Sequence, residues 1–429
     1  MQLDYDIIPE VLLWATIFFI ILYVLYRRYI YSFIDPLFIF VFTTAFASVL
    51  VINVLEDTSA VVSFFVCQLF LFLGFDSVQR FSTLSPASDD SDIKFGSTST
   101  LEMTVYILFF MYVIGNIVLF FTKGFALLSD NPSDSKVADF RGGFGIIRKI
   151  NWSAGSFVTT GLLYLYLKSK RKKYLFLLLI VIIFTAVEGS KGSLLKVLAA
   201  FAFLAYHPIF RGRAEIFILF KRYIPIGTLA LITIFSVVLL KENQQTDQAM
   251  FALARRFLYS ADSILYYYTP VNINYFSRYN FMDYPAYLAN PVLGFFRIAP
   301  YKEVFGNIMV ENALPDFAKA DVIVGPNIPF YIEGQIFFGY YGAFIHSFLI
   351  GASYSLIRLL FFSLKSGSSF FFIFLCTLSQ IAGNIITDTS LFVTMLSDTC
   401  VFVLPVYILT NFILHSKVTI KHVSFSRMI

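Results

Sequence analysis

The long apolar runs of this chain constrain its fold more than any other feature. Hydrophobic residues make up 58% of the 429 residues, charged residues only 14%, and the mean hydropathy is +0.76. This composition lies outside the range of soluble domains. Because a helix needs about 20 apolar residues to cross the hydrocarbon core of a membrane, the sequence predicts an all-α polytopic membrane protein.

Eleven runs, with 10–12 as the range, are candidates for transmembrane helices. They are residues 8–26, 36–55, 60–76, 101–121, 153–168, 174–188, 193–210, 223–240, 336–362, 369–386 and 391–414. The first run follows Asp4 and Asp6 rather than a basic segment, so we expect no cleavable signal peptide.

One long polar segment, residues 241–328, interrupts these runs. Ordering a long loop costs conformational entropy that a short turn avoids. We therefore interpret residues 241–328 as the functional region of the protein. The chain then divides into transmembrane helices 1–8 (residues 1–240), the long loop with interfacial helices (241–328), and helices 9–11 with a short cytoplasmic tail (329–429).

The distribution of Lys and Arg predicts the orientation of the chain. With the N-terminus outside, the cytoplasmic segments hold 17 of the 32 Lys and Arg residues, including the dense cluster at 168–173. The long loop is then external, which is the periplasm in a Gram-negative host. Segment 122–152 is an exception, because it is basic and yet external in this scheme.

Two basic elements are candidates for binding a phosphate group. Residues 188–193 (EGSKGS) place Lys191 between two glycines at the start of a helix, a combination that suits an anion. The alternative is a helical hairpin in which Glu188 and Lys191 pair. Arg255 and Arg256 lie in an amphipathic stretch, where guanidinium groups could bind phosphate oxygens or anchor an interfacial helix to lipid headgroups.

The loop also contains many tyrosines, with Arg278 and Arg297 among them. Flat amphipathic rings suit the faces of sugars, and the same rings suit the membrane interface. The sequence names Tyr267, Tyr268 and Tyr279 as candidates for sugar binding.

Glu333 lies where the loop returns to an apolar run, within GPNIPFYIEGQIFFGYYG (residues 325–342). Burying an unpaired carboxylate is expensive, so we expect Glu333 to pair with an arginine of the loop or to act on a substrate. Gly334, Gly339 and Gly342 allow either close helix packing or close approach of a ligand.

Several classes of chemistry find no support in the sequence. The three cysteines lie singly in apolar runs, and the four histidines lie outside the long loop and form no metal-ligand pair. No P-loop, nucleophile elbow or Asp-x-Asp motif is present. We therefore expect no metal and no cofactor.

Taken together, the Gly-Ser-Lys-Gly turn, the late external loop and the closing Glu-Gly-x-x-x-x-Gly-x-x-Gly element resemble the O-antigen polymerases (Wzy), a family of bacterial repeat-unit polymerases. The resemblance implies a lipid-linked-sugar transferase (GT-C-like) scaffold in the bacterial inner membrane, with its active site facing the periplasm. It also matches Lys191 to the basic position of the turn, Arg255 or Arg256 to the basic position early in the loop, and Glu333 to the acid before the last glycines.

This resemblance implies the transfer of a growing glycan from undecaprenyl pyrophosphate onto the next lipid-linked repeat unit. Glu333, Arg255 and Arg256 would be catalytic, and Lys191, Arg278 and Arg297 would bind pyrophosphate. We expect one cationic patch lined by Lys191, Arg255, Arg256 and Arg278. Lipid-linked oligosaccharides, membrane lipid and a chain-length regulator protein are the expected partners, and nucleic acid is not.

Three rival functions remain, and one of them, a receptor or structural membrane protein, leaves the paired arginines and Glu333 unexplained. A flippase or other transporter predicts charged residues facing a cavity at the membrane midplane; Lys196, Arg358 and Glu102 lie within the predicted spans, and none is clearly central. A ligase-type transferase is the other rival. The ligases are associated with a histidine in the large loop, and this loop has none.

Overall fold

The computed structural model describes residues 8–82, 94–124, 144–187, 193–210, 257–314 and 325–426. The chain forms two compact units. The first comprises Met1–Ser85, Arg213–Leu359 and Ala382–Val393, and the second Pro86–Gly212, Leu360–Ile381 and Thr394–Ile429. Each unit therefore combines segments that are far apart in the sequence.

Seven helices among the described residues are long and apolar enough to cross a membrane. These candidate spans are Pro9–Tyr26, Pro36–Val54, Thr58–Phe81, Ser99–Lys123, Phe330–Phe362, Ser369–Thr387 and Thr389–Leu414. The structure therefore supports the predicted all-α membrane protein, while the number eleven remains a prediction.

Three further predicted spans form helices that do not meet the same standard. α7 (Lys172–Val187) and α8 (Ser193–Tyr206) have only 16 and 14 residues, and α6 (Gly145–Ser169) is long but more polar. The predicted span 223–240 lies outside the described residues.

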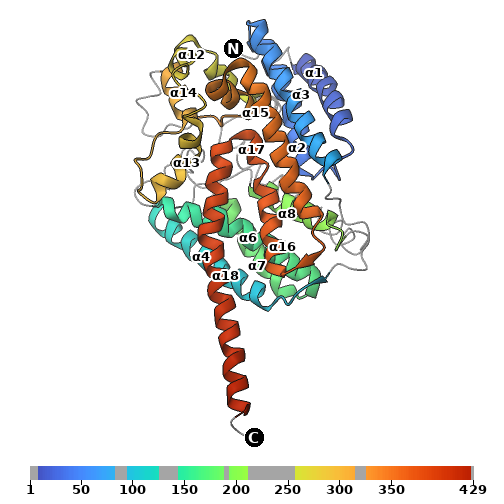
Figure 1. Ribbon diagram of the computed structural model, residues 1–429, viewed down its shortest axis with the longest axis vertical. Helices are drawn as coiled ribbons and strands as arrows, with labels where there is room; N and C mark the ends of the chain where they lie inside the picture. Colours follow the sequence, from blue (N-terminus) through green and yellow to red (C-terminus); the bar gives the residue numbers. More distant parts are fainter. Residues whose placement is uncertain are drawn as a thin grey trace. The chain divides into compact units, whose positions relative to one another are not determined.

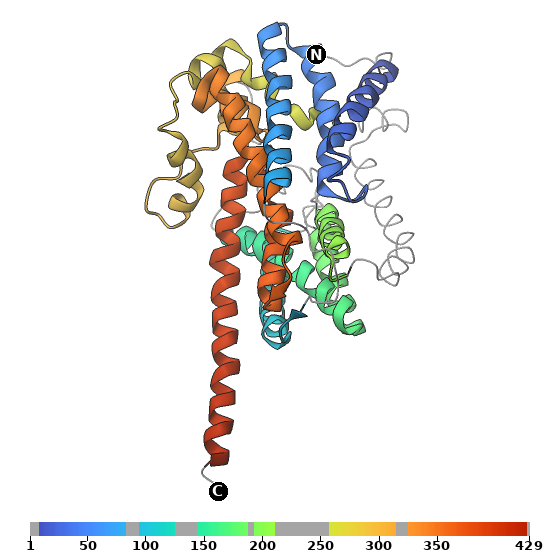
Figure 2. The same ribbon diagram turned by 45° about the vertical axis from the view of Figure 1, so that its right-hand side comes forward.

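The first unit contains three N-terminal helices, a group of short loop helices and α15 (Figures 1 and 2). Its elements are α1 (Ile8–Tyr26), α2 (Pro36–Val54), α3 (Thr58–Phe81), η4 (Tyr259–Ala261), α11 (Ser263–Tyr267), α12 (Pro270–Phe276), α13 (Tyr284–Phe295), α14 (Phe305–Ala313), α15 (Phe330–Phe362, to Leu359 in this unit), α17 (Asn384–Thr387) and the first residues of α18 (Thr389–Ser426).

A buried ion pair fixes α15 to the start of α2. Asp35 caps α2 by accepting hydrogen bonds from the backbone N–H groups of Tyr31 and Leu37. The Arg358 guanidinium donates to both Asp35 oxygens, at 2.8 and 2.6 Å, and both side chains are buried. Arg358 thus has a structural explanation that needs no ligand.

Small residues let α15 approach α3 closely. A Cβ added at Gly74 would lie 1.9 Å from the Phe348 carbonyl oxygen, and one at Gly351 would lie 2.0 Å from the Leu71 carbonyl oxygen. Only glycine fits at either contact, as is common where membrane helices pack tightly.

Gly339 divides α15 at a sharp corner (Figures 1 and 2). Its φ of 71° and ψ of −175° are almost exclusive to glycine. Residues 330–338, which we call the short arm, pack back against the helix after the corner: a Cβ at Gly334 would lie 2.9 Å from the Ala343 Cα. The predicted span 336–362 lies within the candidate span Phe330–Phe362, and the chain turns inside it at Gly339.

The second unit is built around α6 (Gly145–Ser169), which buries most of its residues. The remaining elements are α4 (Ser99–Lys123), α7, α8, α16 (Ser369–Ile381), the rest of α18, and two-residue strands β1 (Lys94–Phe95) and β2 (Ser366–Gly367), which pair in parallel. Gly161 contacts Val105 of α4, so the two helices pack closely.

Candidate functional site

The short arm holds Glu333, which is completely buried. Its Oε2 accepts a 2.6 Å hydrogen bond from the Thr389 hydroxyl at the start of α18. Its Oε1 has no hydrogen-bond partner among the described residues. Buried polar atoms are almost always hydrogen bonded, so a buried carboxylate oxygen without a partner indicates a candidate functional residue.

A phenol and an imidazole lie beside this carboxyl group. The Tyr284 hydroxyl is 3.0 Å from Nε2 of His346, and it also interacts with Glu333 and Thr389. Nδ1 of His346 is 3.2 Å from the Phe330 carbonyl oxygen. We call Glu333, Thr389, Tyr284 and His346 the carboxyl cluster.

Asp388 is a second acidic group near the carboxyl cluster. Its Oδ1 accepts a 2.8 Å hydrogen bond from the Leu391 N–H, and so caps the start of α18. Burial raises the pKa of Asp388 above its ordinary value. Burial also raises the pKa of Tyr284 far above its ordinary value, and the negative charge of Glu333 adds to this effect. Tyr284 is therefore a neutral hydroxyl at physiological pH.

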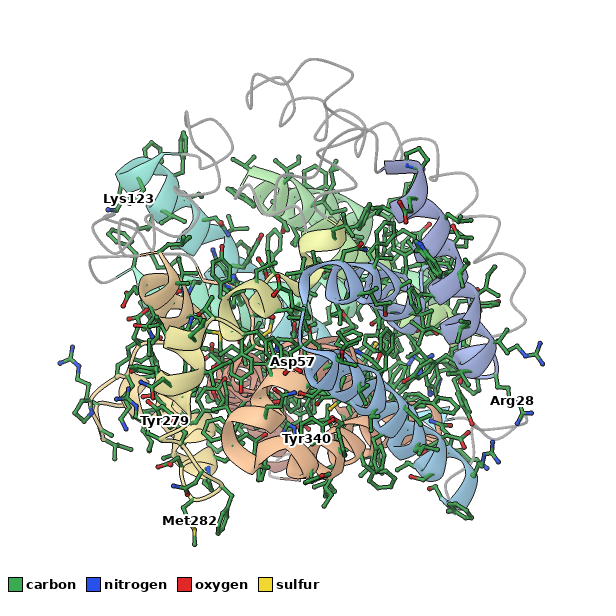
Figure 3. All side chains as sticks on the ribbon, turned by 90° about the horizontal axis from the view of Figure 1, so that it is seen from above. Arg28, Asp57, Lys123, Tyr279, Met282 and Tyr340 are labelled. Atoms are coloured by element: carbon green, nitrogen blue, oxygen red, sulfur yellow. The ribbon has the colours of Figure 1, made fainter. Side chains whose placement is uncertain are left out.

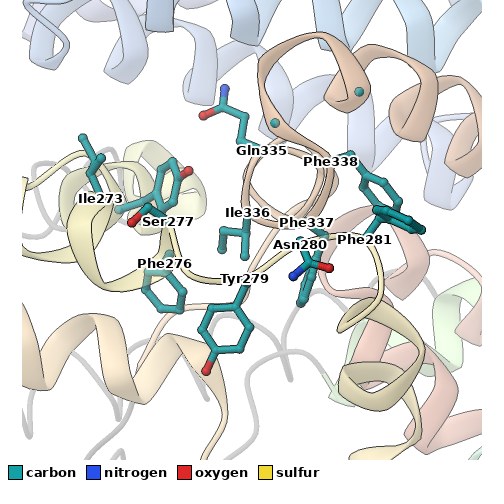
Figure 4. A pocket seen from close by; sticks show the side chains of 13 residues that line it. Ile273, Phe276, Ser277, Tyr279, Asn280, Phe281, Gln335, Ile336, Phe337 and Phe338 are labelled. Atoms are coloured by element: carbon teal, nitrogen blue, oxygen red, sulfur yellow. The ribbon is translucent and has the colours of Figure 1, made fainter.

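A cavity of about 650 Å³ lies beside the corner at Gly339 (Figure 4). One wall comes from α12 and the turn that follows it, and the other from α15. Its lining is Tyr267, Ile273, Phe276, Ser277, Tyr279, Asn280, Phe281, Gln335, Ile336, Phe337, Phe338, Gly339 and Gly342. The described lining has six aromatic rings and no charged side chain, so it suits a neutral ligand with flat apolar faces.

The cavity and the carboxyl cluster share one stretch of the short arm. Phe337 lines the cavity and lies one helical turn after Glu333. Its ring contacts the ring of Tyr284, with 5.2 Å between centroids. Phe337 therefore connects the cavity wall to the carboxyl cluster.

Gln335 ties the cavity wall to α3. Its Oε1 accepts a 2.9 Å hydrogen bond from the Tyr268 hydroxyl, and its Nε2 donates to the Ser63 hydroxyl at 2.8 Å. Tyr340, just after the corner, reaches the Ser59 carbonyl near Asp57 at the start of α3 (Figure 3). Residues before and after Gly339 are therefore both hydrogen bonded to α3, and these bonds fix the position of the corner.

The loop helices form a framework held by asparagines. Asn272 of α12 is fully buried and donates to the carbonyls of Tyr266 and Met309, while it accepts from Asn312. Because each of its polar atoms has a partner, α11, α12 and α14 are fixed to one another. The predicted working loop thus has an ordered core among its described residues.

The three predicted sugar-binding tyrosines lie close to this cavity. Tyr267 and Tyr279 line it, and burial raises the pKa of Tyr267 to about 12. Tyr268 does not line it, but orients Gln335, which does. Figure 3 shows Tyr279 facing α15, whereas the neighbouring Met282 points outward.

The predicted cations that lie in the described part of the chain do not form a cationic patch. Arg278 is exposed and stacks on the Tyr275 ring, with its Cζ 3.6 Å from the ring centroid. Arg297 is also exposed, in a left-handed backbone conformation. Lys191, Arg255 and Arg256 lie outside the described residues, so the cationic patch remains a prediction.

The expected partner of Glu333 was an arginine of the long loop. Within the described part of the chain, neither Arg278 nor Arg297 forms an ion pair with it. Its Oε2 accepts from the Thr389 hydroxyl, and pairing of Glu333 with Arg255 or Arg256 stays a prediction because both lie outside the described residues.

The second unit contains a buried ion pair that was not predicted from the sequence. Asp398 lies inside the last predicted span, is 3% exposed, and accepts a 2.8 Å hydrogen bond from Lys149 Nζ. Nearby, Asn151 donates to the Asn116 side chain. These polar groups lie on helices α6, α4 and α18.

Sequence reasoning also missed Thr389 and His346 as site residues. An ionisable residue inside an apolar run is a functional candidate in its own right, and this signal alone could have selected His346. No comparable signal points to Thr389, because one threonine in a membrane helix is unremarkable.

Comparisons with protein-family models, with curated proteins and with solved structures find no match for this chain. Its class, an all-α membrane protein, therefore rests on the helices themselves.

Proposed function

We propose that the chain is a glycosyltransferase that polymerises undecaprenyl-pyrophosphate-linked oligosaccharide repeat units into O-antigen or a related surface polysaccharide. It would act at the periplasmic face of a bacterial inner membrane. The observation that carries the proposal is Glu333, a buried carboxylate with an unpartnered oxygen, next to a neutral aromatic cavity formed by the long loop and α15. The sequence resemblance supports the same function.

In the proposed reaction, the oxygen of an acceptor hydroxyl attacks the anomeric carbon of the donor sugar while Glu333 takes the hydroxyl proton. The bond between that carbon and the pyrophosphate oxygen breaks, and its electron pair leaves with the polyprenyl pyrophosphate. Cations stabilise the charge that develops on this leaving group. Lys191, Arg255 and Arg256 are the proposed cations, with Arg278 and Arg297 at the surface of the loop.

The cavity supports a sugar ligand rather than a phosphate. Its described lining has no cation to balance a phosphate, but it offers the rings of Tyr267 and Tyr279 and the polar groups of Ser277, Asn280 and Gln335. Rings that pack on sugar faces, with a few amide and hydroxyl groups between them, suit a neutral saccharide. The pyrophosphate would then bind elsewhere, at the proposed cations.

The direct test is Glu333→Gln in a host strain that lacks its own copy of the gene. Gln keeps the shape and removes the carboxylate, so the variant should insert normally and yield only core plus one repeat unit on a lipopolysaccharide gel. Glu303→Gln is a matched control, because Glu303 is an exposed acid of the same loop; it should give the full ladder. A full ladder from Glu333→Gln at normal expression would refute the assignment.

A second candidate function, transport of a lipid-linked glycan, has two specific observations in its favour. Asp398, inside the candidate span Thr389–Leu414, is paired with Lys149, and Gly339 breaks one apolar helix. Proteoliposomes with a fluorescent lipid-linked oligosaccharide distinguish the two functions. Transbilayer movement without chain lengthening would favour transport, and chain lengthening in detergent, where no bilayer exists, would favour the polymerase.

A further inference from the structure

The hydrogen positions in the carboxyl cluster follow from its acceptors. The Phe330 carbonyl oxygen can only accept, so Nδ1 of His346, at 3.2 Å, must be the protonated nitrogen of the neutral ring. Its other nitrogen, Nε2, is then an acceptor, and the Tyr284 hydroxyl at 3.0 Å must donate to it.

Because the Tyr284 hydroxyl donates its hydrogen to His346, the Tyr284 oxygen can only accept hydrogen bonds from its other neighbours. The single hydrogen of Thr389 is used at 2.6 Å by Oε2 of Glu333. The Glu333 carboxyl group interacts with the same hydroxyl, and its Oε1 has no hydrogen-bond partner among the described residues. A proton on Oε1 is therefore the donor in the cluster that could reach the Tyr284 oxygen. Hydrogen counting thus favours a resting state in which Glu333 is protonated.

A protonated Glu333 is the wrong form for a base, which must be charged to accept a proton. We propose that His346, acting through the Tyr284 hydroxyl, takes the proton of Glu333 and supplies the positive charge that balances this carboxylate. The proposal rests on the function proposed above, and it makes His346 a positioning residue and Glu333 the catalytic one.

The proton transfer balances without any outside reagent. The Glu333 proton passes to the Tyr284 oxygen while the Tyr284 hydrogen passes to Nε2 of His346. The product is a Glu333 carboxylate, an unchanged phenol and a His346 imidazolium that keeps its bond to the Phe330 carbonyl. Charge separation across one phenol is less costly than an isolated buried carboxylate, because the two charges attract each other in a poorly screened environment.

Two other titratable groups, Asp388 and Tyr287, interact with the cluster. Asp388 precedes α18, and Tyr287 of α13 interacts with both acids. The negative charge of Asp388 opposes ionisation of Glu333, so it increases the need for a nearby cation. Among the described residues, no Lys or Arg forms an ion pair with Glu333, and His346 is the base in hydrogen-bond contact with Tyr284.

The test measures the protonation of Glu333 directly, by difference infrared spectroscopy of substrate-free protein in lipid nanodiscs. Subtracting the Glu333→Gln spectrum isolates the carboxyl band of this residue. We expect His346→Gln, which can accept the Tyr284 hydrogen bond but cannot take a proton, to keep Glu333 protonated to a higher pH than in the wild type. Tyr284→Phe should do the same by removing the connecting hydroxyl, and serves if His346→Gln does not fold.

His207→Gln is the matched control, because His207 is also fully buried and bonded to a backbone carbonyl, but in the second unit. It should leave the Glu333 band unchanged. Identical titration of the Glu333 band in wild type, His346→Gln and Tyr284→Phe would overturn the proposal.

Activity gives a second, separable measurement. His346→Gln should lower the polymerisation rate about 10²-fold at neutral pH, move the acid limb of the pH–rate profile to higher pH, and recover part of the rate there. A merely structural role would lower the rate equally at every pH, and that result would overturn the proposal. A coupled infrared titration in a wild-type protein that makes no polymer would instead refute the proposed function and leave the proton transfer standing.

Discussion

Glu333 in the first unit and Asp398 in the second are both buried carboxylates in candidate membrane spans. Each has one oxygen without a partner among the described residues, but they differ in what balances their charge. Asp398 is paired with the Lys149 ammonium at 2.8 Å. Among the described residues Glu333 has no ion-pair partner, and its Oε2 accepts from the Thr389 hydroxyl at 2.6 Å. A hydroxyl dipole offsets much less of the desolvation cost than a full opposite charge does.

The difference separates a structural charge from a reactive one. An ion pair such as Lys149–Asp398 balances a buried negative charge with a positive one and holds α6 to α18. A carboxylate without a cation is less stable when ionised, which makes it a better proton acceptor once it is charged. Glu333 on the short arm therefore has the properties of a reactive group, whereas the Lys149–Asp398 pair has the properties of a structural contact between α6 and α18.

Removing a partner should separate the two carboxylates most clearly. Lys149→Met leaves a buried Asp398 charge without compensation and should lower the free energy of unfolding by about 3–5 kcal/mol. The double variant Lys149→Met/Asp398→Asn should recover most of that loss. Glu333→Gln should change stability by less than about 1 kcal/mol, since it removes no ion pair. Thermal unfolding in detergent measures all three, and a larger loss for Glu333→Gln than for Lys149→Met would reverse the comparison.

Substitution of two glycines tests whether the corner at Gly339 matters for function. Gly124 in the second unit has nearly the same backbone conformation and serves as the control. Gly339 has φ 71° and ψ −175°, Gly124 at the end of α4 has φ 82° and ψ −171°, and an added Cβ would meet no atom within 4 Å at either position. Alanine at either site should therefore cost about 1–3 kcal/mol of backbone strain alone.

Only Gly339→Ala should also shorten the glycan chains, because it displaces the short arm that holds Glu333. Gel analysis beside thermal unfolding measures both effects. Equal chain lengths in Gly339→Ala and Gly124→Ala would show that the position of the short arm does not matter for polymerisation.

Sequence patterns predicted the parts of this molecule that depend on local order. Apolar runs predicted the helices, and the cost of burying an acid indicated Glu333. Ring chemistry named Tyr267 and Tyr279, which both line the cavity, while their binding of a sugar stays a prediction. The cluster around Glu333 could not be predicted, because Thr389 lies 56 residues further along the chain. Hydropathy locates a helix but does not determine which helices pack together. The same limit hid the pairing of Lys149 with Asp398, which are separated by 249 residues.

The finest test of the comparison concerns two threonines on the same helix. Thr389 donates to Glu333 in the first unit, whereas Thr410 shares a 2.8 Å hydrogen bond with the Thr104 hydroxyl in the second. Valine matches threonine in shape and lacks the hydroxyl, so Thr389→Val and Thr410→Val should each cost about 1 kcal/mol of stability. Their effects on chemistry should differ.

Without the Thr389 hydroxyl, the Glu333 carboxylate loses its direct donor, and its charged form becomes less favourable. Thr389→Val should therefore need a higher pH for full polymerisation, while Thr389→Ser, which keeps the hydroxyl, should behave as the wild type. Thr410→Val should leave the pH profile unchanged, because its hydroxyl serves only the packing of α18 on α4. If both valine variants moved the profile equally, the shift would come from a general loosening of α18, and Glu333 would depend on the helix rather than on this hydrogen bond.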